Sequence, residues 1–591
     1  MDKLKIKRVF YICLFLLIAS CSSVKRTEHE EAQNILSSFP KKIIVKNKTH
    51  IPSKGVLKAL FIFVQFDDDK NVKSKAWTYD TLSLPSWAKT FVNKEPSRNF
   101  PVKNISQYYY EMSNGKFFLT GDVYPELVRP LYSQKHYKSV SEVNYEILKR
   151  LDNKIDYSKY DNWSKDRDGN FVREPDKKVD MIYMIYRNFS NRLFFNNGWT
   201  GIAHLYLTKK IKTNDGVTIA KGSLDRGSGI VIRGGKNGAY WLKYVAAHEL
   251  GHFFFGSGHI QGVTNLAVMT GGPVWNASRG MHSWERARLG WINYIDVKPG
   301  VDKVFTLPDY MTSGKALKLK LSGKEWFVVE NREHLSVNDK SGDKGIYIYH
   351  INNADRYTPR IFVECADGNW DFKIDTKKNK LYKIKPNPNG KNEMNFARVI
   401  NRKNYACFKP IYKDNSAWGD NTDAFDVKYN NVFSPVSNPS SKNNAKVPFT
   451  IEVLKKTGTD YKIKFYFNNP YEGKPSKPQY LRVKINSSKH PKLSWSNNRE
   501  LDILYYKIYV QVGKMYNKTK LKLVKKTNYL DKNKSVVNWT DLNTKLYPKN
   551  KSYFYAVKAV DKSGKESVIS NPVKIYWRGK WVVDKTFEVQ R

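Results

Sequence analysis

The first half of the chain alternates between uninterrupted apolar runs and segments with helical spacing. The longest apolar run, residues 59–66, has the length and composition of a buried strand and ends in three aspartates. Further strands are expected at 117–123 and 179–186, and helices at 105–112 and 140–151. A mixed sheet with accompanying helices, an α+β unit, is therefore predicted for residues 57–300.

The pattern changes after about residue 301, where short alternating runs dominate and no long helical spacing is evident. Such runs are typical of antiparallel strands, and they predict a β-rich extension over residues 301–472. The expected strands include 304–307, 326–330, 345–350 and 449–454. A proline-bearing linker at 473–478 opens the last segment, in which further alternating runs predict a small β-sandwich within residues 473–591.

The amino-terminal residues predict export. Residues 1–20 combine basic residues with an apolar run that is short for a membrane span, and small residues precede Cys21. This resembles the bacterial lipobox, which implies cleavage before Cys21 and acylation of its thiol, so that the mature chain is anchored in the cell envelope by lipid. The alternative is an ordinary signal peptide with an incidental cysteine. Residues 21–56 are expected to form a tether or a short pro-segment, with a helix around Glu28–Leu36.

Charge and cysteine usage narrow the expected surroundings. The formal net charge is +47, from 102 Lys and Arg against 55 Asp and Glu, which favours a membrane surface, acidic glycans or acidic substrates as neighbours. The lysines are spread along the chain instead of forming one tract, so no specific nucleic-acid partner is expected. Apart from the signal and Cys21, the cysteines are Cys365 and Cys407. In an oxidising compartment these either form a disulfide or remain two separate buried thiols.

The helix predicted at 240–254 carries side chains that can bind a metal. It contains the sequence HELGH at 248–252. Residues four apart lie on one helical face, so His248 and His252 can direct two imidazoles at one zinc ion. Glu249 follows the first ligand and can act as general base on a water molecule at the metal. Zinc-dependent peptide hydrolysis needs this arrangement, because zinc activates the water and polarises the scissile carbonyl. The alternative is a pair of ordinary histidines on a helix.

Residues that follow the helix can complete this metal site. Gly256 and Gly258 permit a sharp turn, after which His259 is placed to return as the third ligand. Met269 lies in the sequence VMTGG at 268–272 and is a candidate for a methionine-bearing turn beneath the metal.

Together, the HELGH sequence, His259 and Met269 resemble the zinc-dependent metallopeptidases of the metzincin type. The resemblance implies a zincin-like catalytic domain in which a zinc-binding helix lies beneath a cleft and Glu249 is catalytic. The metzincin pattern has two residues between the second histidine and the glycine, whereas three phenylalanines stand at 253–255 here. The helix must therefore run further, or bulge, before its turn.

A narrower resemblance, to the immune inhibitor A family of secreted bacterial metallopeptidases, covers roughly residues 57–468. It depends on short segments taken jointly, at 60–67, 109–116, 160–169, 284–291, 327–333, 345–350 and 366–368. In that family the third ligand is often an acidic residue after the turn. No carboxylate stands close behind His259 here, so the resemblance favours His259 as the third ligand.

Members of that family tend to bind calcium, which implies a calcium site with oxygen ligands from Asp161, Asp166 and Asp168. Basic and aromatic residues interrupt this acidic run, so a solvated loop is the alternative.

The last segment has its own resemblance, because Trp495, the sequence YKIY at 506–509 and the run 553–561 are similar to a fibronectin type III module. Such a module implies a spacer or a binding role.

Three functions follow from these patterns. The first is a zinc-dependent endopeptidase of the bacterial cell envelope that hydrolyses extracellular proteins or peptides. The second is a surface-binding lipoprotein, an adhesin or glycan binder, with a structural or vestigial zinc site. The third is hydrolysis of a non-peptide amide by the same zinc chemistry. The presence of Glu249 favours an active site over a vestigial one, since this residue is not needed to hold the metal, and the patterns leave the oligomeric state open.

Overall fold

The computed structural model describes residues 28–587, apart from 45–48, 71–72, 80, 195–199, 261–262, 264–265, 271–278, 341, 355–358, 369–371, 376–379, 384–421, 471–472, 499, 528–535 and 544–547. The chain divides into two compact units. The first comprises Met1–His259, Ala267–Met269 and Val274–Asn293, and the second comprises Ile260–Leu266, Thr270–Pro273 and Tyr294–Arg591. No helix within the described ranges is both long and apolar enough to cross a bilayer.

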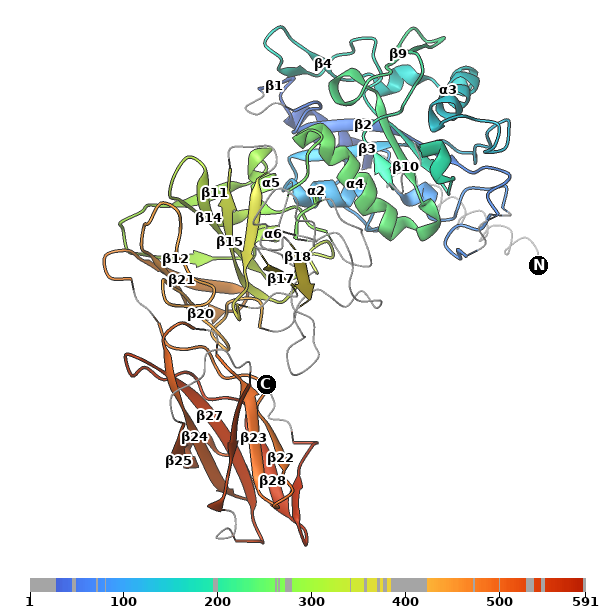
Figure 1. Ribbon diagram of the computed structural model, residues 1–591. Helices are drawn as coiled ribbons and strands as arrows, with labels where there is room; N and C mark the ends of the chain where they lie inside the picture. Colours follow the sequence, from blue (N-terminus) through green and yellow to red (C-terminus); the bar gives the residue numbers. More distant parts are fainter. Residues whose placement is uncertain are drawn as a thin grey trace, which may run out of the picture. The chain divides into compact units, whose positions relative to one another are not determined.

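A five-stranded sheet with the order β3-β2-β6-β10-β7 organises the first unit (Figure 1). Its strands are β2 (Gly55–Val64), β3 (Phe117–Val123), β6 (Ile182–Tyr186), β7 (Gly201–Ile202) and β10 (Gly229–Arg233). The first four strands in this order pair in parallel, and β7 runs antiparallel to β10 at one edge. All residues of β6 are buried, as expected for a central strand covered on both faces. The prediction of a mixed sheet from uninterrupted apolar runs is confirmed.

Several helices accompany this sheet in the first unit. The main ones are α2 (Ile105–Met112), α3 (Val140–Arg150), α4 (Ala239–Phe255) and α5 (Ser283–Arg288), so the helices expected at 105–112 and 140–151 are present. Val143 and Ile147 of α3 share a core cluster with Leu60 and Ile62 of β2. Because side chains alternate along a strand, Phe61 points to the opposite face of the sheet. Helix α4 lies against β10, β7 and α2, and Figure 1 shows α4 with α2 and β10 beside it.

Residues 28–44 are part of the first unit. Residues 28–38 form the expected helix, and its Ile35 packs with Val56 and Phe118. Strand β1 (Lys42–Ile43) then pairs with β5 (Phe171–Val172), which also pairs with β4 (Ser164–Lys165). A short hairpin is formed by β8 (Ile211–Lys212) and β9 (Thr218–Ile219). The described part of the expected tether thus contributes a helix and a strand to the fold.

The second unit starts with two antiparallel sheets, of order β11-β13-β14-β15-β16 and β12-β21-β20-β19. Their strands are β11 (Asn293–Val297), β12 (Lys303–Leu307), β13 (Lys315–Lys320), β14 (Glu325–Arg332), β15 (Gly345–Asn352), β16 (Arg360–Glu364), β19 (Val432–Phe433), β20 (Thr450–Thr457) and β21 (Asp460–Tyr466), with the short helix α6 (Tyr310–Ser313). The strands β17 (Phe372–Asp375) and β18 (Lys380–Lys383) form a separate two-stranded hairpin. Both sheets contribute apolar side chains to one core, including Leu317 and Ile463. The alternating runs after residue 301 are therefore antiparallel strands, as predicted.

The last part of the chain is a two-sheet sandwich, of order β22-β23-β26 and β25-β24-β27-β28-β29. Its strands are β22 (Arg482–Ile485), β23 (Pro491–Ser496), β24 (Ile503–Gly513), β25 (Lys522–Lys526), β26 (Val536–Thr540), β27 (Ser552–Asp561), β28 (Val573–Trp577) and β29 (Trp581–Val583). Trp495 of the first sheet and Tyr506 of the second are fully buried in a shared core and contact each other edge to face. The protein is thus mixed α/β and rich in strands, and the predicted sandwich is present.

The predicted cysteine chemistry falls largely outside the described ranges. Cys21, the predicted lipidation site, and Cys407 both lie outside them. Cys365 follows β16 and is fully buried. The disulfide between Cys365 and Cys407 stays a prediction, as does the lipid anchor.

Candidate functional site

Helix α4, which carries the predicted zinc motif, is enclosed on nearly every side. Between Leu242 and Phe255 every residue is buried except His248. A helix that is apolar all round must be enclosed in this way to be stable. The hydroxyl of Tyr109 on α2 donates a hydrogen bond to the carbonyl of Ala247, at 2.9 Å, and so anchors the middle of α4. The helix therefore forms a fixed base for the side chains that project from its partly open face.

The three phenylalanines after the second histidine lengthen the helix. Phe253, Phe254 and Phe255 are buried and all belong to α4. The helix ends at Gly256, which has φ of +79°, a conformation that glycine adopts without strain. The carbonyl of Gly256 lies 2.8 Å from Nδ1 of His252. Of the two possibilities considered for this departure from the metzincin pattern, the longer helix is the one observed.

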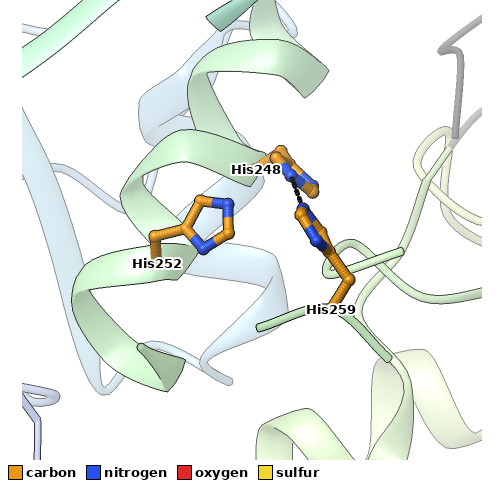
Figure 2. A group of neighbouring side chains, drawn as sticks. All are labelled: His248, His252 and His259. Carbon is orange, nitrogen blue, oxygen red and sulfur yellow. Dashed lines mark hydrogen bonds between the residues drawn. The ribbon is translucent and has the colours of Figure 1, made fainter. Parts of the chain in front are cut away.

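The three predicted metal ligands lie together. Figure 2 shows the imidazoles of His248, His252 and His259 facing one another, with His259 arriving from the segment after the helix. One nitrogen from each ring lies within 4.8 Å of the others, and among the described residues this is the group of His, Cys, Asp or Glu side chains that can hold a metal ion. The Nε2 atoms of His248 and His259 are 3.2 Å apart. Two nitrogens on one tetrahedral zinc ion, each at about 2.0–2.1 Å, would stand about 3.3–3.4 Å apart, so the observed spacing fits zinc.

The hydrogen bonds of the imidazole rings also suit metal binding. Nδ1 of His248 lies 2.7 Å from the carbonyl of Val268, and Nδ1 of His252 contacts the carbonyl of Gly256. A carbonyl only accepts hydrogen bonds, so each Nδ1 must carry the proton and each Nε2 keeps its lone pair. Burial lowers the pKa of all three rings, that of His259 to about 4. The neutral form needed for metal binding is therefore favoured at neutral pH.

Glu249 lies beside the edge strand of the sheet. Its side chain is 5% exposed, and burial raises the pKa of its carboxyl to about 8. A Cβ built on Gly201 of β7 would fall 2.5 Å from Oε1 of Glu249 and 2.8 Å from its Cγ and Cδ. A buried carboxyl with a raised pKa gains stability in its charged form from a nearby cation. The cluster of His248, His252 and His259 is suited to hold such a cation.

Met269 packs directly beneath the zinc helix. It is 1% exposed, and a Cβ on Gly251 would overlap its sulfur atom. The glycine of the HELGH sequence is thus required by the close approach of this side chain. Met269 thus lies against the helix at Gly251, and its role in a methionine-bearing turn beneath a metal stays a prediction.

Comparisons with known proteins leave the function of this arrangement open. No protein-family model and no curated protein matches the chain. Similar solved structures include the FN5 domain of Drosophila Lar, with 23% identity over 18% of this chain and 98% of that one, at a TM-score of 0.13. Another is the third fibronectin III domain of human KIAA0343 protein, with 17% identity over 18% of this chain and 89% of that one, at a TM-score of 0.14.

A further similar structure is pectate lyase PelI from Erwinia chrysanthemi, with 19% identity over 16% of this chain, at a TM-score of 0.13. The match spans only 27% of the lyase chain. At these TM-scores the likeness has no bearing on what this protein does.

The predicted calcium ligands are not brought together. Asp166 forms an ion pair with Lys42 at 2.6 Å and accepts hydrogen bonds from Asp168 and Asn170 backbone amides. Asp161 instead accepts a hydrogen bond from the backbone amide of Asp176. Within the described ranges these carboxylates form no group of three that converges on one point. The geometry gives the calcium site no support.

Sequence reasoning missed two residues of this site. Gly201 was not singled out, although a glycine in a strand signals a close approach. Glu285 was named only as part of the segment 284–291, one of those on which the family resemblance depends. It is fully buried on α5, and it accepts hydrogen bonds from backbone amides near Met269.

Proposed function

We propose that the protein is a zinc-dependent endopeptidase. The observation that carries this proposal is the convergence of His248, His252 and His259, one nitrogen each within 4.8 Å, with Glu249 next to the first of them. The three histidines would hold the zinc ion. Bound there, zinc supplies a Lewis acid that polarises a carbonyl and makes water a better nucleophile.

The chain's own groups supply the remaining chemistry. Glu249 accepts a proton from the attacking water and delivers it to the leaving amine. The carbonyls of Val268 and Gly256 hold the protonated Nδ1 atoms of His248 and His252 in fixed orientation. The burial of Glu249 excludes water that would otherwise solvate its carboxylate, which strengthens its electrostatic interactions.

The edge strand indicates the kind of substrate. β7 is the last strand of its sheet within the described ranges, and Gly201 on this strand lies beside Glu249. An edge strand offers backbone N–H and C=O groups with which an extended peptide can pair as an added strand. A peptide bound in this way would run past the general base, which favours a peptide over another amide as the substrate.

The test of this function is zinc content and chelator-sensitive proteolysis. For the chain from residue 22 onward, we expect about one zinc ion per chain. We also expect casein hydrolysis that a chelator abolishes and added zinc restores. Zinc without cleavage would contradict the peptidase activity. Absence of zinc from protein prepared with zinc would contradict the metal site itself.

Zinc is also expected to stabilise the fold through His259. A ligand present at about 1,000 times its Kd raises the free energy of unfolding by about 4 kcal/mol. Urea unfolding with and without zinc measures this difference. His259→Ala should remove most of it, because one of three ligands is lost. His136→Ala is the matched control, since His136 is exposed and stacks on Tyr132. An equal zinc effect in all three proteins would contradict the assignment of His259.

The location and the family assignment are part of the same proposal. We infer a protein lipid-anchored through Cys21 in the bacterial cell envelope, related to the immune inhibitor A family, with extracellular proteins as substrates. The zincin-like character of the first unit is supported by the mixed sheet, its antiparallel edge strand and the position of α4. The sandwich would then act as a spacer or as a binding module.

A further inference from the structure

Glu285 accepts hydrogen bonds from three backbone amides, one at the start of its own helix and two in a loop that is distant in sequence. Its side chain is fully buried at the start of α5. Oε1 accepts a hydrogen bond from the amide of Met269 at 2.8 Å, and Oε2 accepts from the amides of Val268 at 3.2 Å and His282 at 2.7 Å. The bond to His282 belongs to the capping box of α5. The other two reach a loop 16 and 17 residues earlier, and no helix cap requires them.

The loop that Glu285 holds is the one that orients His248. The carbonyl of Val268 lies 2.7 Å from Nδ1 of His248, and the side chain of Met269 packs against Gly251 of the same helix. Val268 and Met269 are therefore held by Glu285 on one side and by α4 on the other. Their amides point to Glu285, while one carbonyl and one side chain point to the zinc helix.

We propose that Glu285 is a positioning residue of the metal site, which acts on His248 through the peptide of Val268 and Met269. The inference rests on the proposed function, because it assigns this role toward the zinc ion of that site. A carboxylate offers only acceptors, so both of its oxygens suit amide donors. A hydrogen bond to a charged group contributes about twice as much as one between neutral groups. With this peptide fixed, its carbonyl keeps the proton of His248 on Nδ1 and the lone pair of Nε2 directed at the metal.

The variant Glu285→Gln tests this role, because glutamine keeps the shape but presents an NH₂ group to a backbone donor. Loss of such an outer partner of a metal-binding histidine costs about 10–100-fold in metal affinity, and we expect zinc affinity to fall within that range. The measurement is a competition titration of zinc with a chromophoric chelator, alongside urea unfolding of the metal-free protein. The titration needs no enzymatic activity.

Glu325→Gln is the matched control. Glu325 is 4% exposed in the second unit and accepts hydrogen bonds from the amides of Asn444 and Ala445, at 3.0 and 3.1 Å. Both variants should lose stability without metal, and only Glu285→Gln should lose zinc affinity. Unchanged zinc affinity in Glu285→Gln, or an equal loss in both variants, would overturn the positioning role.

Hydrogen exchange on the wild-type protein keeps the inference testable if Glu285→Gln does not fold. The amides of Val268 and Met269 should be protected from exchange both with and without zinc, and rapid exchange in the metal-free protein would overturn the inference. The two proposals can also fail separately. Zinc binding that depends on Glu285 in a protein that cleaves no peptide would support the positioning role and contradict only the peptidase. A wild-type protein that binds no zinc would overturn both.

Discussion

Replacing Glu249 with glutamine is expected to lower kcat/KM for peptide cleavage by about 10²–10⁴-fold, the usual contribution of a positioned general acid–base group. Glutamine has nearly the same shape but cannot accept the proton of the attacking water. The three histidines are unchanged, so the variant should bind zinc as the wild type does. The measurements are steady-state cleavage of a fluorogenic peptide and zinc content of the same preparation.

Glu126→Gln is the control for this change, because Glu126 is an exposed residue of the same unit. It should retain full activity. A Glu249→Gln protein with wild-type cleavage that still depends on zinc would exclude Glu249 as the base. Loss of both zinc and cleavage would show instead that Glu249 supports the metal site, which would contradict the division of roles proposed for α4.

Helix α4 could be predicted from sequence because its pattern is local. The expected helix at 240–254 is observed as Ala239–Phe255, and the spacing of His248 and His252 places both rings on one face. The position of His259 was predictable only because two glycines follow the helix closely. The end of the helix could not be predicted, since three buried phenylalanines fit either a longer helix or a bulge. The packing of Phe254 against Tyr109, Phe117 and Trp291 accompanies the longer helix.

The contacts that were missed are between residues far apart in sequence. Periodicity identifies β2 and β6 as strands but does not show that the two-residue strand β7 completes their sheet and brings Gly201 to Glu249. It also cannot show that β1 pairs with β5, so residues 21–56 were expected to form a tether or a short pro-segment. The segment around Glu285 resembled a family motif, yet the contacts of Glu285 with the amides of Val268 and Met269 depend on tertiary structure alone. The aspartates of 161–168 are the opposite case, in which closeness in sequence suggested a site that the fold does not assemble.

Gly201 provides a second large effect that depends only on shape. A Cβ at this position would fall within 2.8 Å of three side-chain atoms of Glu249, Oε1, Cδ and Cγ. Rotation of the carboxylate alone cannot relieve all three contacts, so either Glu249 or the edge strand must move. A displacement of about 1 Å in a catalytic group can lower the rate about 10²-fold. We therefore expect Gly201→Ala to reduce kcat/KM for peptide cleavage by about 10²-fold while zinc remains bound.

Gly323→Ala is the matched control, since a Cβ there meets no atom within 4 Å. It should cleave the peptide as the wild type does. The crystal structure of Gly201→Ala should show Glu249 displaced from its position beside β7 and the three histidines unmoved. Full activity in Gly201→Ala would mean that the carboxylate works from a different position, and the alignment of a peptide along β7 would then lose its main support. A loss of zinc would show that Gly201 is needed for metal binding and not only for the position of Glu249.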